Sequence, residues 1–138
     1  MIFHQETPIQ LRFNDLDSFG HVNNTTIQEY FDLGRIFYFR KVFGEPIDWD
    51  NFQAIVASIK TDFMAPVFLN DQLVVKTKIT KIGNKSIQLS QQLAEGEKVI
   101  KATCDSVMVG FNPKTQSSIE ISDKWRKQIK ALETDLEE

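Results

Sequence analysis

The segment from Asn23 or Asn24 to about Val42 most constrains the fold, because it predicts a helix that is buried on nearly every side. Apolar residues recur there at steps of three and four, which is the spacing of one helix face. The residues that set this spacing are Ile27, Tyr30, Phe31, Gly34, Phe37 and Tyr38. Leu33, Ile36 and Phe39 widen the apolar face until it covers most of the circumference. The rest of the chain must therefore cover this helix.

Most of the remaining chain has the pattern of β-strands separated by turns. Residues 5–13 alternate between apolar and polar side chains, as in a half-buried strand. The same reasoning predicts four later strands, over residues 53–63, 73–80, 87–93 and 99–111. Turn residues separate these strands, among them Gly83-Asn84 and Gly96. Hairpin-length turns between the strands require antiparallel pairing.

A short helix is predicted at the end of the chain, over about residues 122–136, with Ser122 as its N-cap. The acidic end, Glu133 to Glu138, is expected to fray. The order of elements is thus strand, long helix, four strands and short helix, which indicates the α+β class. The simplest way to bury the long helix is to wrap the antiparallel sheet around it, and this arrangement is a hotdog fold.

Length, charge and cysteine content limit the classes of function. The 138 residues are enough for one domain, and we assign residues 1–138 to it. The net charge of −3 argues against a general nucleic-acid binder, which needs a basic face. Cys104 is the only cysteine, so no intrachain disulfide is expected, in agreement with a reducing, cytoplasmic compartment. We expect no signal peptide and no membrane span, which needs roughly 18 consecutive apolar residues.

The segment Arg12–Asn24 concentrates groups that can do chemistry, between the first predicted strand and the long helix. It contains two acids, Asp15 and Asp17, followed by His21. A helix N-terminus offers unpaired backbone N–H groups and a partial positive charge, which can stabilise a developing oxyanion. A carboxylate just upstream can activate a water molecule against the same carbonyl. The segment therefore predicts a base and an oxyanion site within one loop.

Each of these residues also has an ordinary structural interpretation. Asp17 fits a turn residue or a helix-capping aspartate, and Asp15 fits a solvated or capping acid. His21 fits either an active-site donor or a residue that orders the loop. Asn is a preferred N-cap residue, so Asn23 or Asn24 is expected to cap the helix. A metal site made of Asp15, Asp17 and His21 lacks a recognised ligand spacing.

The segment resembles the motif of the 4-hydroxybenzoyl-CoA thioesterase-like hotdog thioesterases, particularly the bacterial long-chain and short-chain acyl-CoA thioesterases. That motif places an Asp four residues before His-Val-Asn-Asn, and then an aromatic residue, an acid and an Arg in the helix. The matching residues here are Asp17, His21-Val22-Asn23-Asn24, Tyr30, Asp32 and Arg35. A second block of the family is similar to Phe63, Pro66 and Asn70-Asp71. The resemblance covers about residues 6–115.

Three positions depart from the family pattern. Ile27 stands where an aromatic residue is usual, which alters the expected acyl pocket. Asn70 replaces a turn glycine, a mild change because Asn tolerates the left-handed conformation. Plant acyl-carrier-protein thioesterases share the His-Val-Asn-Asn signature but carry an Asn where this chain has Phe19. Only a mechanism based on Asp17 is therefore carried over.

The resemblance implies hydrolysis of acyl-CoA to a free acid and coenzyme A. Asp17 is the expected general base or nucleophile, and backbone N–H groups from Val22 to Asn24 are expected to hold the carbonyl oxygen. Tyr30 and Asp32 are expected to shape or orient the pocket. The resemblance implies no metal and no organic cofactor. It also implies a homodimer or homotetramer with sites between subunits.

Other activities remain open at this point. Acyl-carrier-protein thioesters are an alternative substrate, and a non-catalytic acyl-binding domain is an alternative function. A hotdog dehydratase is disfavoured, because its acid and His typically come from different elements, whereas here they share one loop. Lys60, Lys81 and Lys85 are candidates for contacts with the phosphates of coenzyme A, although each also fits a solvated lysine.

Overall fold

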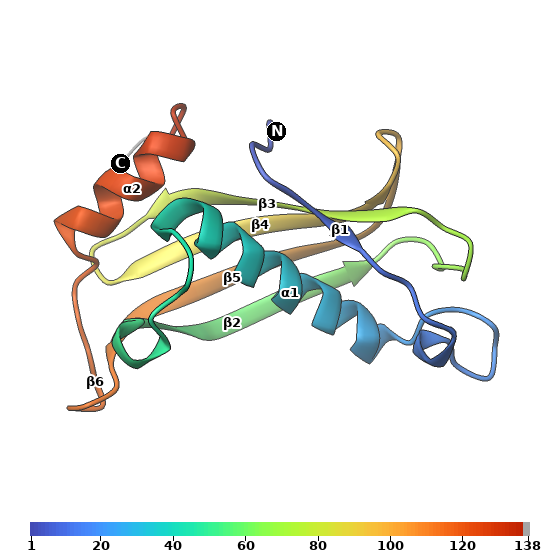
Figure 1. Ribbon diagram of the computed structural model, residues 1–138, viewed down its shortest axis with the longest axis horizontal. Helices are drawn as coiled ribbons and strands as arrows, with labels where there is room; N and C mark the ends of the chain where they lie inside the picture. Colours follow the sequence, from blue (N-terminus) through green and yellow to red (C-terminus); the bar gives the residue numbers. More distant parts are fainter. Residues whose placement is uncertain (137–138) are drawn as a thin grey trace.

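A long helix lies across one face of an antiparallel sheet in the computed structural model, which describes residues 1–136 except for the side chain of Asn51 (Figure 1). The helix is α1 (Asn24–Phe43), and a second helix, α2 (Asp123–Leu132), lies beyond one end of the sheet. The strands are β1 (Glu6–Ile9), β2 (Ala54–Phe63), β3 (Leu73–Ile82), β4 (Ser86–Glu95), β5 (Val99–Asn112) and β6 (Ser117–Ser118). Two short 3₁₀ turns cover Phe13–Asp15 and Trp49–Asn51. The predicted class, an antiparallel sheet against one long helix, is confirmed.

The strands lie in the order β1-β3-β4-β5-β2, with β6 added to β5, and every pairing is antiparallel. The predicted hairpins are confirmed for β3–β4 and β4–β5. The prediction is wrong for β2 and β3, which are not neighbours. The connection 64–72 carries the chain between opposite sides of the sheet, so β2 becomes an edge strand. Val67 in this connection is buried, and its carbonyl accepts the Val22 N–H at 2.9 Å, so the crossing passes the start of α1.

Helix α1 is buried on one side, and the prediction of burial on nearly every side is wrong for the single chain. The buried positions are Ile27, Tyr30, Phe31, Gly34, Arg35, Tyr38 and Phe39. Leu33 and Phe37 are each 38% exposed, because the sheet covers only one side of the helix. At Gly34 the helix comes so close to β3 that an added Cβ would lie 2.5 Å from Cγ1 of Val75.

The C-terminal segment is more ordered than its composition predicts. The predicted cap of α2 is confirmed, since Oγ of Ser122 accepts the Trp125 N–H at 3.2 Å. The helix ends at Leu132, four residues before the predicted end. The expected fraying is wrong for Glu133, which is 1% exposed and accepts a hydrogen bond from the Tyr38 hydroxyl at 2.6 Å. Residues 137–138 of the same prediction lie outside the described residues. At the other end of the chain, β1 is shorter than the predicted strand 5–13. It ends at Ile9, and the 3₁₀ turn begins at Phe13.

Candidate active site

The loop between Leu16 and Val22 brings Asp17 and His21 face to face at the start of α1. Leu16 and Val22 form an isolated antiparallel bridge. Inside it, the Asp17 N–H donates to the His21 carbonyl at 2.8 Å. Gly20, with a φ of 86°, closes the turn by donating its N–H to the Asp17 carbonyl at 3.2 Å. This conformation favours glycine. The backbone of the loop therefore explains why Asp17 and His21 lie together.

One oxygen of the Asp17 carboxylate accepts a hydrogen bond within the loop, and the other does not. Its Oδ1 accepts the Phe19 N–H at 2.8 Å and lies 3.9 Å from Nδ1 of His21. Among the described residues, nothing donates a hydrogen bond to its Oδ2, and the side chain is 26% exposed. Asp17 is thus a turn residue, as predicted, and its Oδ2 is free to accept a proton from a water molecule.

His21 is positioned by ring contacts as well as by Asp17. Its ring stacks on Phe19 at 6.3 Å between centroids and meets the edge of Phe68 at 6.0 Å. Phe19 and Phe68 are themselves 81% and 48% exposed. Large apolar side chains in water are costly to hold in place without a partner, so this end of the molecule presents a surface suited to a ligand or to another chain. Sequence reasoning missed Phe68, since it follows a strand and belongs to no motif.

The first turn of α1 has fewer free donors than the sequence suggests. The N–H groups of Val22 and Asn23 donate to the carbonyls of Val67 and Asp15, at 2.9 and 3.1 Å. As predicted, Asn23 is the N-cap, and its Oδ1 accepts the Thr25 N–H at 2.8 Å. Within the described part of the chain, the N–H groups at the first and third helical positions, Asn24 and Thr26, have no acceptor. The expected oxyanion donors therefore narrow from Val22–Asn24 to Asn24, with Thr26 as a neighbour that sequence reasoning missed.

Asp15 is a buried acid that caps the 3₁₀ turn, so its interpretation as a capping acid is confirmed and its interpretation as a solvated acid is wrong. Asp15 is 3% exposed and accepts the Tyr30 hydroxyl at 2.6 Å. The Arg12 backbone N–H and guanidinium also donate to it, at 3.2 and 3.1 Å. Burial alone would raise the pKa of Asp15, but the hydrogen bonds from Tyr30 and Arg12 bring it below its ordinary value. Asp15 thus points away from Asp17, toward the helix.

Tyr30 is the partner of Asp15 and a part of the core. Its side chain is 6% exposed and packs with Val22, Phe31 and Val67. Burial, followed by the hydrogen bond to Asp15, raises the pKa of the Tyr30 hydroxyl far above its ordinary value, so the hydroxyl is a donor. In this structure Tyr30 fixes the position of the 3₁₀ turn against α1, which supports the loop that carries Asp17.

Farther along α1, Asp32 and Arg35 form an ion pair, with Asp32 exposed and Arg35 4% exposed. The Arg35 guanidinium also donates to Oε1 of Gln91 at 2.9 Å. Cys104 lies beside this guanidinium and is fully buried. The ion pair borders an apolar hollow of about 480 Å³ between α1 and the exposed side of β2.

The three lysines do not gather around Asp17 within one chain. Lys60 lies on β2, with its ammonium 3.7 Å from Oδ2 of Asp62. Lys81 and Lys85 are exposed near the β3–β4 turn. That turn lies at the α2 end of the sheet, since the Asn84 carbonyl accepts the N–H of Ile121, just before α2. The 20-residue helix α1 separates this end from the Asp17 loop by about 30 Å.

Comparison with known proteins places the chain in a family. Residues 11–129 match the model of the thioesterase-like superfamily. A thioesterase from Thermus thermophilus, solved in complex with coenzyme A and Zn, is 29% identical, with a TM-score of 0.85 over 96% of each chain. A predicted thioesterase from Bacillus stearothermophilus is 27% identical, with a TM-score of 0.84 over 92% of this chain and 94% of that one. The long-chain acyl-CoA thioesterase FadM of Escherichia coli is 25% identical over 92% of this chain and 98% of its own.

Proposed function

Because the chain belongs to the thioesterase-like superfamily, we propose that it is an acyl-CoA thioesterase, which hydrolyses acyl-CoA to a free acid and coenzyme A. The observation that carries the proposal is the Asp17 carboxylate, with one oxygen unengaged by the described residues, beside a helix N-terminus. FadM supports the substrate class as a distant relative, and the Thermus thermophilus structure supports coenzyme A as the carrier.

In the proposed reaction Asp17 acts at the thioester carbonyl. As a general base, its Oδ2 takes a proton from water, and the oxygen of that water adds to the carbonyl carbon. The carbon–sulfur bond then breaks, and Asp17 returns the proton to the departing sulfur, which leaves as the thiol of coenzyme A. As a nucleophile, the carboxylate attacks the same carbon, the carbon–sulfur bond breaks to release coenzyme A, and water then hydrolyses the resulting anhydride. In either route the negative charge that develops on the carbonyl oxygen is held by the Asn24 N–H, with the help of the helix dipole.

The other residues of the site have supporting roles in the proposal. His21 orients Asp17, since its Nδ1 lies 3.9 Å from Oδ1, and the His21 ring is itself in contact with Phe68. Tyr30 holds Asp15 and thereby the loop, rather than binding substrate itself. Of the three lysines, Lys60 is the best candidate for a contact with a coenzyme A phosphate. It lies on β2, an edge strand that a substrate can approach. Lys81 and Lys85 can reach a phosphate only of a substrate bound at another subunit.

The decisive experiment is a hydrolysis panel that detects released thiol from short, long and aromatic acyl-CoAs. We expect release from at least one class, with no added metal. Faster release from the same acyl group on acyl-carrier protein would change the carrier but keep the reaction. No release from any thioester, combined with acyl-CoA binding by calorimetry, would instead establish the alternative of a non-catalytic acyl-binding domain.

We further propose that two copies assemble through β2. Among residues 1–136, β2 pairs only with β5, so its other edge presents free backbone groups. Ile55, Val56, Ile59 and Phe63 on this strand are 40–45% exposed. A long apolar edge is a template for pairing with another strand. A second copy of β2, placed antiparallel, would extend the sheet and cover the hollow beside Asp32 and Phe39.

Light scattering of the protein at micromolar concentration should therefore give at least twice 15.9 kDa. Ile59→Asp should give a folded monomer, because it places a charge in the centre of the proposed interface. Val99→Asp is the matched control, since Val99 is 46% exposed but lies on β5. A wild-type monomer that hydrolyses thioesters at full rate would rule out a site shared between subunits.

The proposed compartment is the cytoplasm, where acyl-CoA is made and used. Neither helix of the described residues 1–136 is long and apolar enough to cross a bilayer.

A further inference from the structure

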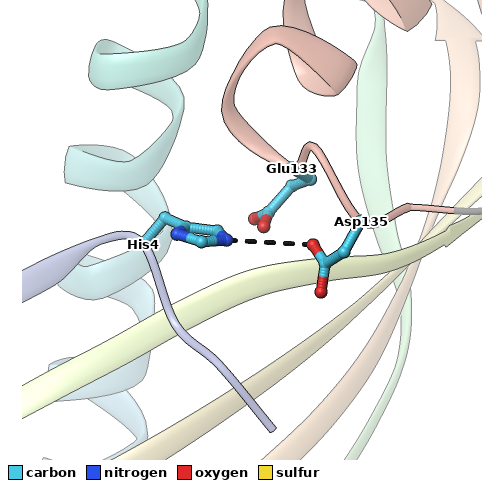
Figure 2. Close-up of side chains that lie close together, drawn as sticks. All are labelled: His4, Glu133 and Asp135. Carbon is cyan, nitrogen blue, oxygen red and sulfur yellow. Dashed lines mark ion pairs between the residues drawn. The ribbon is translucent and has the colours of Figure 1, made fainter.

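Three side chains that could together hold a metal ion, from segments far apart in the sequence, lie close to one another (Figure 2). His4 precedes β1, whereas Glu133 and Asp135 follow α2. One candidate ligand atom from each residue lies within 4.8 Å of the other two. Nε2 of His4 and Oδ1 of Asp135 are 3.8 Å apart. No motif connects these positions, so sequence reasoning did not find them.

Glu133 has one carboxylate oxygen that the fold satisfies and one that it does not. The residue is 1% exposed, and its Oε2 accepts the Tyr38 hydroxyl at 2.6 Å and the Ile79 N–H at 3.3 Å. Oε1 is buried and accepts no hydrogen bond from any residue that the structure describes. Figure 2 shows the carboxylate pointing into the space between His4 and Asp135. A buried carboxylate oxygen without a donor is costly, and a cation bound between these side chains would remove that cost.

The groups around these three side chains favour a positive ion, and the site is accessible to solvent. Glu133 and Asp135 supply two negative charges, and the ammonium groups nearby already have partners. That of Lys78 lies 3.5 Å from the other oxygen of Asp135, Oδ2, and that of Lys41 donates to the His4 carbonyl at 2.9 Å. Oδ1 of Asp135 is therefore left to face the imidazole. A hollow of about 290 Å³ opens beside Asp135, whose side chain is 55% exposed, so an ion can approach this ligand from solvent.

We propose that His4, Glu133 and Asp135 bind a zinc ion, through Nε2 of His4 and one carboxylate oxygen from each acid. One imidazole and two carboxylates form a ligand set that suits Zn²⁺, whereas Mg²⁺ and Ca²⁺ prefer oxygen ligands alone. Ligands bound at about 2.1 Å in a tetrahedron are about 3.4 Å apart. Nε2 of His4 and Oδ1 of Asp135 are 3.8 Å apart, and small rotations of these side chains, which are 33% and 55% exposed, would bring them to this spacing. Water completes the coordination.

The position of the site indicates a structural role. The ion would join the segment before β1 to the residues after α2, and through Glu133 and Tyr38 it would reach the C-terminal half of α1. The Asp17 loop lies at the other end of α1, so the zinc would take no part in thioester hydrolysis. Binding of an ion to the folded state alone raises the stability of that state.

The test is isothermal titration calorimetry of Zn²⁺ into the full, untagged chain after removal of metal with chelator. We expect one Zn²⁺ per chain, a higher unfolding temperature with Zn²⁺ and much weaker binding of Mg²⁺. Loss even of a side chain that only supports a metal ligand weakens binding about 10- to 100-fold, so His4→Asn and Asp135→Asn should each cost at least as much. Both side chains are partly exposed, which keeps these variants folded.

Two matched substitutions serve as controls. His21→Asn removes the only other imidazole, and Asp123→Asn removes an exposed acid from the start of α2. Both should bind Zn²⁺ as the wild type does. Absence of binding to the wild type at one ion per chain overturns the proposal. It is also overturned if His4→Asn and Asp135→Asn bind unchanged, or if His21→Asn weakens binding as much as His4→Asn.

Discussion

Asp17→Asn is expected to lower kcat by about 10²- to 10⁴-fold, the usual cost of losing a positioned base. The substitution keeps the size of the side chain and an oxygen that can accept the Phe19 N–H, so the turn persists. It removes the charge that accepts the proton. KM should change far less, and an unchanged KM would indicate that binding of the substrate does not depend on that charge. Steady-state thiol release over a range of acyl-CoA concentrations separates the two constants.

The control for this variant is Asp123→Asn, which makes the same chemical change at an exposed position on α2. It should retain wild-type kcat. Wild-type kcat in Asp17→Asn would show that Asp17 is only a turn residue, and the proposed mechanism would then be wrong. A loss of activity that follows the unfolded fraction of the sample would lead to the same conclusion, so each variant is assayed well below its unfolding temperature.

Asp15→Asn is expected to lower the free energy of unfolding by about 1–3 kcal/mol, the cost of leaving buried polar groups unsatisfied. The amide oxygen can still accept from the Tyr30 hydroxyl and the Arg12 backbone N–H, which share Oδ2, but the NH₂ group then faces the Arg12 guanidinium, another donor. Urea unfolding at neutral pH measures the loss. Combining the variant with Tyr30→Phe in a double-mutant cycle isolates the contribution of the Asp15–Tyr30 hydrogen bond.

The stability from Asp15 should also depend on pH, with a predictable sign. The folded protein holds the pKa of Asp15 below the ordinary value of 3.8. The contribution is therefore fully present above that value and is lost as the pH falls through the lower, folded pKa. In Asp15→Asn this part of the acid sensitivity should disappear. If Asp15→Asn, while still folded, is the variant that loses kcat, the catalytic assignment is displaced by two residues.

The order of the elements could be predicted because it depends on local patterns. The spacing of apolar residues from Ile27 to Phe39 predicts a helix wherever that segment packs, and Gly83-Asn84 predicts a turn in any context. The co-location of Asp17 and His21 is also local, because the bridge between Leu16 and Val22 closes within a few residues. The resemblance to a family rests on the same contiguous segment.

Features that depend on distant residues could not be predicted in this way. The position of β2 at the edge follows from its pairing with β5, and from the path of residues 64–72 across the start of α1. Local patterns place Asp15 at the surface, because its partner, Tyr30, lies more than a full turn inside the next helix. Val67, in the segment 64–72, accepts a hydrogen bond from the Val22 N–H. The number of free N–H donors at the start of α1 therefore depends on a segment that no local sequence pattern connects with the helix.

The sequence by itself therefore determined the class of the fold, its antiparallel hairpins, the loop that holds Asp17 and the capped start of α1. Only the tertiary structure decided which carboxylate is buried, which N–H groups stay free, and that His4 meets Glu133 and Asp135. The physical reason is the distance along the sequence between the residues that interact. Helical spacing and turn conformation are properties of a few consecutive residues, whereas the burial of a charge and the convergence of ligands depend on which distant segments the core brings together.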